Sequence, residues 1–129
     1  MTRIFLDTNF IVSCLKQKIP FLEEINRIID FNYELVIVKQ VFEELEKLAG
    51  SKEDKVRDRE TAKLGLLMLR KAVQEGRIKL LKIEAENVDE ALLKIAKKQD
   101  ILASLDRELK RRIGCKMIVI RQGSYLKLV

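Results

Sequence analysis

The 129-residue sequence contains no histidine. This absence excludes catalytic groups in which histidine activates a serine or cysteine nucleophile, and it excludes zinc sites with histidine ligands. The sequence also lacks the Gly-x-Gly-x-x-Gly pattern of dinucleotide-binding folds and the Gly-Lys-Ser/Thr end of a P-loop. An enzyme with this sequence must therefore rely on carboxylates, hydroxyls, Lys or Arg. Such ligands favour a hard, oxygen-bound metal ion, Mg²⁺ or Mn²⁺.

Long apolar runs are also absent, and no stretch approaches the roughly 18 residues that a membrane span needs. Asp7 and Asn9 interrupt the apolar N-terminus where a signal peptide would have its core. The only cysteines, Cys14 and Cys115, are far apart in the sequence. We therefore expect free thiols in a reducing, cytoplasmic setting and no contact with a membrane.

The net charge of +6 is concentrated at one end of the chain. Residues 107–129 carry seven basic side chains and one acidic one, so residues 1–106 sum to zero. A basic end on a neutral body suits a polyanionic partner such as RNA. A solvated helix face followed by a tail explains the same charges without any partner.

Short apolar runs alternate with helical patterns along the chain. We predict strands over residues 4–6, 34–39, 78–83, 101–104 and 117–120, and helices over 10–16, 20–29, 40–49, 61–75, 88–96 and 106–113. Residues 51–63 form either a solvated helix start or a mobile loop, and the last residues form either an edge strand or a tail. This alternation predicts a single α/β domain over 1–129, a three-layer α/β/α sandwich with a mostly parallel central sheet.

Acidic residues recur where the predicted strands end or the next helices begin. They are Asp7 after the first strand, Glu43 and Glu44 after the second, Asp89 in the first turn of a later helix, and Asp106 shortly after a further strand. Because the carboxyl ends of parallel strands meet at one edge of a sheet, we expect these side chains to gather there. Gathered carboxylates repel one another unless a cation lies between them, so the pattern favours a metal site.

Each acid also has an ordinary structural explanation. Asp89 complements the dipole at a helix N-terminus, and Asp106 is well placed to cap its helix. Asp7 and the two residues after it suit the start of the first helix. Glu43 and Glu44 fit the exposed face of theirs.

Four motifs, in this order, resemble those of PIN-domain ribonucleases. They are Asp7-Thr8-Asn9 after an apolar strand, Val41-Phe42-Glu43-Glu44-Leu45, Asp89-Glu90-Ala91-Leu92-Leu93 and Ser104-Leu105-Asp106. The resemblance spans the whole chain and includes the closing strand from Gly114 to Arg121. It is strongest to small single-domain prokaryotic members, which are VapC-type toxins and archaeal relatives of the PIN endonucleases that process ribosomal RNA.

The resemblance implies an acidic pocket with catalytic and metal-binding roles for Asp7, Glu44, Asp89 and Asp106. Asn9, Ser104 and Glu90 would support this pocket, and Ser104 stands where many members carry Thr. Glu44 is preferred to Glu43 because the family's glutamate directly precedes an apolar residue such as Leu45. Asp89 is preferred to Glu90 because of its spacing from Ala96.

The implied activity is that of an endoribonuclease that hydrolyses RNA phosphodiester bonds with carboxylate-held Mg²⁺ or Mn²⁺. We expect the basic residues Arg107, Lys110, Arg111 and Arg112 to follow the RNA backbone. The family further implies a homodimer and, for a toxin, an antitoxin partner. Whether the chain is a toxin or an RNA-processing nuclease stays open at this point.

Two other functions fit parts of the pattern. A non-catalytic PIN-like scaffold that binds RNA in a processing assembly would keep the fold and the basic segment, although it would not need the full acidic set. A phosphatase of the haloacid dehalogenase type also begins with an aspartate after its first strand. That chemistry needs a second aspartate two residues later, where this chain has Asn9.

Overall fold

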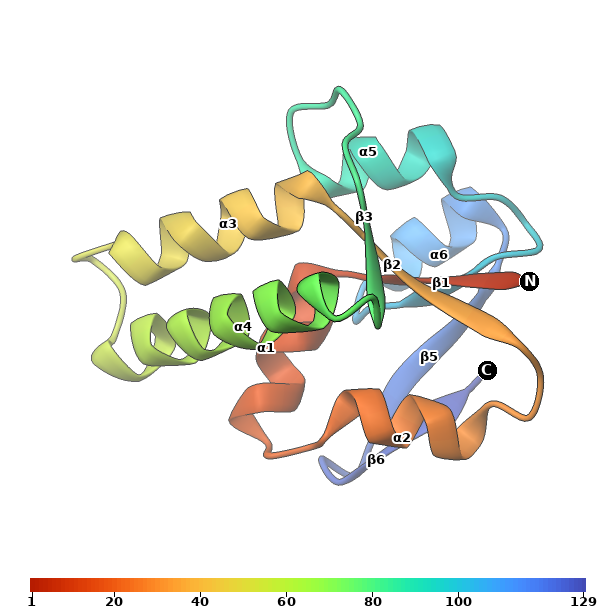
Figure 1. The fold of residues 1–129 in the computed structure, drawn as a ribbon, viewed down its shortest axis with the longest axis horizontal. Helices are drawn as coiled ribbons and strands as arrows, with labels where there is room; N and C mark the ends of the chain where they lie inside the picture. The colour runs from red at the N-terminus through yellow and green to blue at the C-terminus, as the bar shows by residue number, and fades with distance from the viewer.

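Six strands form one sheet in the computed structural model, which describes residues 1–129, and their order is β3-β2-β1-β4-β5-β6 (Figure 1). The strands are β1 (Thr2–Leu6), β2 (Tyr33–Val38), β3 (Ile78–Leu81), β4 (Ile101–Ala103), β5 (Lys116–Arg121) and β6 (Tyr125–Leu128). β1 to β5 are parallel, and β6 pairs antiparallel with β5. The mostly parallel sheet is therefore confirmed, and the last residues form an edge strand.

Six helices cover the two faces of this sheet. They are α1 (Thr8–Lys16), α2 (Phe21–Ile28), α3 (Lys39–Gly50), α4 (Val56–Gln74), α5 (Val88–Ile95) and α6 (Arg107–Ile113). The path from β1 to β3 moves across the sheet in one direction and the path from β3 to β5 returns in the other, so right-handed crossovers put their helices on opposite faces. In Figure 1, α5 and α6 accordingly lie above β1, and α1 and α2 lie below it. The predicted three layers are confirmed.

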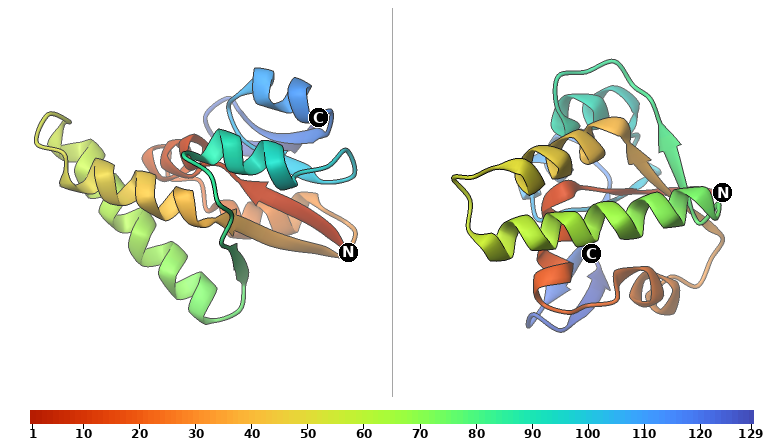
Figure 2. Two further views of the ribbon diagram at one scale, coloured as in Figure 1. Left: turned by 90° about the horizontal axis from the view of Figure 1, so that it is seen from above. Right: turned by 60° about the vertical axis from the view of Figure 1, so that its left-hand side comes forward.

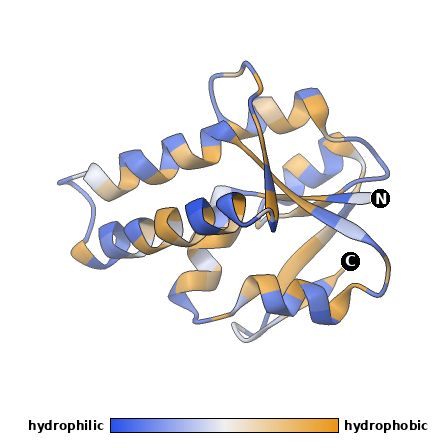
Figure 3. Ribbon diagram, viewed as in Figure 1, coloured by the Kyte–Doolittle hydropathy of each residue, from blue (hydrophilic) through white to orange (hydrophobic).

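The central strands are apolar on both faces because helices cover both. Ile4, Phe5 and Leu6 of β1 are all at most 1% exposed. Figure 3 shows hydrophobic colour running along the strands, whereas the helices alternate between hydrophobic and hydrophilic residues. Continuous apolar runs of this kind are what a buried parallel strand requires.

The helix boundaries differ from the predicted ones for identifiable reasons. α1 begins at Thr8, before Phe10, because Asp7 caps it and accepts a hydrogen bond from the Thr8 amide. Pro20 is the N-cap of α2 and not its first residue, since its ψ of 82° is not helical. α4 begins at Val56, so most of the charged segment 51–63 is a solvated helix start.

α4 and α3 form a long hairpin that projects from the rest of the molecule (Figures 1 and 2). The two helices pack closely against each other, and Gly65 of α4 also lets this helix come close to α1. A Cβ on Gly65 would lie 3.3 Å from Leu15 Cδ1.

None of the helices combines the length and the apolar character that crossing a membrane requires. Cys14 and Cys115 are both free and buried.

A partly buried ion pair fixes the start of β1 to the turn before β4. Arg3 donates from Nε and Nη2 to the two carboxylate oxygens of Asp100, at 3.2 and 2.8 Å, and from Nη2 to the Ile95 carbonyl at 2.9 Å. The Asp100 carboxylate also accepts from the Lys97 amide at 2.8 Å. Asp100 is only 4% exposed, so its charge depends on these partners.

We therefore expect Arg3→Met to lower the free energy of unfolding by about 3 kcal/mol, because it leaves the Asp100 charge buried without its cation. Urea denaturation at pH 7 measures this loss. The control is Arg77→Met, which removes an exposed pair with Glu75. It should cost less than about 1 kcal/mol, and equal losses in the two variants would contradict the argument.

Candidate functional site

The candidate site lies where the chain leaves β1 and β4 toward opposite faces of the sheet. Leu6 and Ala103 are paired across these two strands, and the Asp7 amide donates to the Ala103 carbonyl at 2.9 Å. Asp7 is the N-cap of α1, while Ser104 leads toward α6 on the other face. A crevice at such a reversal of strand order is where open α/β sheets bind ligands.

The Asp7 carboxylate is buried at this point and is 4% exposed. Its Oδ2 accepts a hydrogen bond of 2.6 Å from the Ser104 hydroxyl, and its Oδ1 accepts one of 2.9 Å from the Thr8 amide. These two donors compensate part of the lost hydration of the charge. Asp7 is thus both the cap of α1 and the centre of the candidate site.

Ser104, which is fully buried, links Asp7 to Asp106. Its oxygen accepts a 3.0 Å hydrogen bond from the Asp106 amide while its hydrogen points to Asp7. Asn9 Oδ1 lies 3.5 Å from this hydroxyl and accepts from the Leu105 amide at 3.3 Å. Asn9 and Ser104 therefore lie beside Asp7, and their supporting role stays a prediction.

Glu44 and Asp89 reach the same region from α3 and α5. The Glu44 carboxylate accepts from the Val88 amide, at a distance of 3.5 Å, at the start of α5. The pKa of Asp7 is raised to about 6, mainly because burial disfavours the charged carboxylate. The hydrogen bonds from Ser104 and Thr8 oppose this rise, and the charges of Asp89 and Glu44 add to it. Three of the four predicted acids are thus close enough to interact.

Asp106 and Glu90 hold helix termini. Asp106 Oδ1 accepts from the Leu109 amide at 3.0 Å and caps α6, one hydroxyl away from Asp7. Glu90 accepts from the Glu86 amide at 3.3 Å and pairs with Lys94 at 3.6 Å, so it stabilises the start of α5. The proposed supporting role of Glu90 stays a prediction.

The donor set suits a hard divalent cation in chemical type. It offers carboxylate oxygens, a hydroxyl and an amide oxygen, and the mutual repulsion around Asp7 would be relieved by a positive charge. In this structure no three acidic or thiol side chains lie close enough together to hold a metal ion. Binding would require Glu44, Asp89 and Asp106 to turn toward Asp7.

The predicted RNA-binding residues lie on α6, directly after Asp106. Arg111 donates to both carboxylate oxygens of Glu108, which neutralises part of its charge. Arg107, Lys110 and Arg112 make no ion pair. Arg107 and Arg112 are exposed, so they offer the freest cations of this helix.

Two polar atoms near this edge were not identified from the sequence. Thr8 Oγ1, next to Asp7, is buried without a partner, and so is Gln40 Oε1 on α3. The sequence feature that could have identified Gln40 is its position on the buried face of a helix, four residues before Glu44. A polar residue at such a position needs hydrogen-bond partners.

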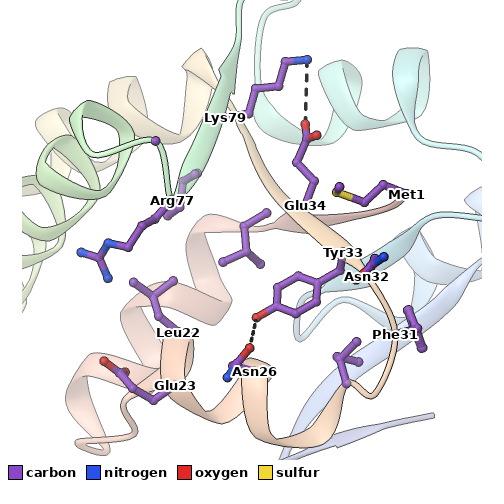
Figure 4. A pocket seen from close by; sticks show the side chains of 14 residues that line it. Met1, Leu22, Glu23, Asn26, Phe31, Asn32, Tyr33, Glu34, Arg77 and Lys79 are labelled. Carbon is purple, nitrogen blue, oxygen red and sulfur yellow. Dashed lines mark hydrogen bonds and ion pairs between the residues drawn. The ribbon is translucent and has the colours of Figure 1, made fainter.

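A cavity of about 950 Å³ lies at the other end of the strands. Tyr33 and Leu35 of β2 and Ile78 of β3 contribute to its wall, and Figure 4 shows Tyr33 pointing toward Asn26. Its charges are mixed, with Lys79 3.8 Å from Glu34. This cavity contains none of the predicted site residues and is distinct from the acidic edge.

Comparison with known proteins matches the chain to one family over most of its length. The family described as "PIN like domain" matches residues 4–123. Ribonuclease VapC4 of Methanocaldococcus jannaschii is 33% identical over 133 aligned positions, which cover 99% of this chain and 97% of that protein.

Solved structures share the fold. The PIN domain endonuclease Utp24 superposes with a TM-score of 0.73 at 23% identity and covers 98% of this chain and 90% of its own. VapBC2 of Rickettsia felis, solved bound to a DNA fragment from the promoter, gives a TM-score of 0.53 at 13% identity over 92% of this chain and 98% of that one. These likenesses establish the architecture of the sheet and its helices.

The raised pKa of Asp7 predicts that the carboxylate destabilises the metal-free protein at neutral pH. Asp7 binds its proton more tightly in the folded than in the unfolded state, so stability falls as the pH rises from about 4 to about 6 and stays low above that. Asp7→Asn should therefore raise the free energy of unfolding by up to about 3 kcal/mol at pH 8 and by little at pH 4.

Urea denaturation in a chelating buffer across this pH range measures the difference between variant and wild type. Glu43→Gln, which removes an exposed acid near the same edge, is the control and should give a flat difference. A flat difference for Asp7→Asn as well would show that burial does not perturb the Asp7 carboxylate.

Proposed function

This chain belongs to the family of PIN-like domains, and from that premise we propose that it is a metal-dependent endoribonuclease that hydrolyses RNA phosphodiester bonds at the acidic edge. The observation that carries the proposal is the Asp7 carboxylate, buried beside Ser104 and raised in pKa in part by the charges of Asp89 and Glu44. The name of the VapC4 relative supports a ribonuclease.

In the proposed mechanism, Asp7, Glu44, Asp89 and Asp106 hold one or two Mg²⁺ or Mn²⁺ ions. A cation bound there would polarise the scissile phosphate and lower the pKa of a bound water molecule. Water adds to phosphorus and the bond to the 3′ oxygen breaks, which leaves a 5′-phosphate and a 3′-hydroxyl. The residues of this chain orient the ligands and hold the substrate.

Ser104 fixes one ligand for this reaction. Its hydroxyl donates to Asp7 Oδ2, so the other carboxylate lone pairs of Asp7 keep a defined direction. Asn9 holds the turn between Ser104 and Asp106 through the Leu105 amide. Both residues act on the geometry of the acids and not on the phosphate itself.

The cations of α6 bind the RNA backbone in this proposal. Arg107 and Arg112 are exposed and form no ion pair, and Arg107 directly follows Asp106. A phosphate chain approaching four carboxylates is repelled, and cations at the margin of the site compensate this repulsion. Lys110 and Arg111 extend the same surface.

We further propose a VapC-type toxin with an antitoxin partner and a homodimeric state. The near full-length similarity to a protein named VapC4 supports the toxin, and one chain of the VapBC2 complex shares the fold. An RNA-processing nuclease is the second candidate, since the PIN domain endonuclease Utp24 also shares the fold. If expression of this chain arrests growth and the product of a neighbouring gene relieves the arrest, the result favours the toxin over the RNA-processing nuclease.

The central test is cleavage of a labelled RNA panel by wild type and Asp7→Asn, with Mn²⁺, Mg²⁺ or a chelator. We expect metal-dependent cleavage by the wild type and at least a roughly 100-fold loss in the variant, because a principal ligand is gone. Glu43→Gln is the matched control and should keep its activity. RNA that is bound but stays intact under every condition would instead favour the non-catalytic scaffold.

A second test addresses RNA binding by α6. Arg107→Glu with Arg112→Glu should weaken binding roughly tenfold or more and flatten its dependence on salt, because two phosphate contacts are lost. Binding is measured with Asp7→Asn as background, so that the RNA stays whole. Lys52→Glu with Lys71→Glu changes the net charge equally at exposed positions of the α3–α4 hairpin. If this control weakens binding as much, α6 is not the RNA surface.

A further inference from the structure

A buried glutamine joins two of the elements that carry the predicted acids. Gln40, the second residue of α3, is only 1% exposed. Its Nε2 donates to the carbonyl oxygens of Ile83 at 2.7 Å and Ala85 at 3.0 Å. Both carbonyls belong to the connection from β3 to α5, which passes beside the start of α3 in Figure 1.

This connection leads directly to Asp89. Asn87 caps α5 by accepting from the Glu90 amide at 2.9 Å, and Asp89 is the second residue of that helix. One turn after Gln40, Glu44 contacts the Val88 amide. Gln40 and Glu44 therefore attach the start of α5 to α3 at two points that are one helical turn apart.

The other polar contacts of this connection are exposed, and one of them is the hydrogen bond from the Glu86 amide to Glu90 at 3.3 Å. Lys39 lies 3.8 Å from the carboxylate of Glu84, whose side chain is almost fully exposed, and Lys94 reaches the Glu84 carbonyl from the surface. Exposed pairs of this kind contribute little to holding two elements together. The buried amide of Gln40 is the contact that orders the connection.

An amide at this position is unfavourable for the core taken alone. Gln40 Oε1 is buried and has no hydrogen-bond partner, which leaves the cost of removing it from water uncompensated. A Met side chain would fill nearly the same volume without an unsatisfied polar atom. The position therefore favours the two hydrogen bonds of Nε2 over the best packing.

We propose that Gln40 is a positioning residue that fixes the separation of Glu44 and Asp89, and with it the acidic edge that binds the divalent cation. The inference rests on the proposed function, since it assigns Gln40 a part in the same site. Small displacements of ligands matter there because a cation tolerates little error in its coordination. Gln40 itself touches neither the cation nor the RNA.

The test compares wild type, Gln40→Met and a control in the metal-free and Mn²⁺-bound states. Gln40→Met keeps the length of the side chain and removes both donors. We expect amide hydrogen exchange at residues 88–90 to become roughly tenfold faster and the dissociation constant of Mn²⁺, measured on the protein alone, to rise at least tenfold. Gln40→Asn, which keeps the amide but is one methylene shorter, serves if Gln40→Met does not fold.

The control is Asp100→Asn, which weakens the other end of the α5 region through its contact with the Lys97 amide. It should lower the melting temperature while leaving the affinity for Mn²⁺ unchanged. Unchanged affinity in the Gln40 variants, or an equal loss in Asp100→Asn, would overturn the positioning role. A wild type that binds no Mn²⁺ would overturn the proposed function, and the hydrogen-exchange rates of residues 88–90 would then decide by themselves whether Gln40 fixes the start of α5.

Discussion

The hydrogen bond from Ser104 to Asp7 is the interaction on which the candidate site depends. It joins the ends of two parallel strands that are 97 positions apart in the sequence and places a carboxylate where hydration is largely lost. Burial of such a charge is unfavourable, and the two donors to Asp7 compensate it only in part, as its raised pKa shows. The protein therefore keeps a destabilising group at the point where its strand order reverses. Functional sites are where such costs are retained.

The same residues serve the fold and the site. Asp7 and Asp106 each cap a helix, and both are connected through Ser104. A helix N-terminus offers free amides that hold a carboxylate in a fixed direction. Capping therefore does not compete with a catalytic role for these aspartates. The cap holds one oxygen of each acid and leaves its remaining oxygen lone pairs for a ligand.

The strands and most helices were predictable because their signals are local. An apolar run such as Ile4 to Leu6, or a cap such as Asn87, is visible in a few neighbouring residues. The order of the strands is not, since it depends on which face each crossover takes. The early start of α4 could not be distinguished from a loop in the sequence because its first turns are solvated and carry no apolar stripe. The ion pair of Arg3 with Asp100 joins residues that no sequence pattern links.

Charge explains why metal and RNA depend on each other in the proposed function. The acidic edge repels a phosphate chain, and the cations of α6 lie at its margin and not among the carboxylates. A divalent cation among the carboxylates would remove the repulsion where the scissile phosphate must come closest. The phosphate would in turn supply oxygen ligands that the separated acids do not provide by themselves. By linkage, each partner then strengthens the binding of the other, so the free protein binds the cation less tightly than its complex with RNA does.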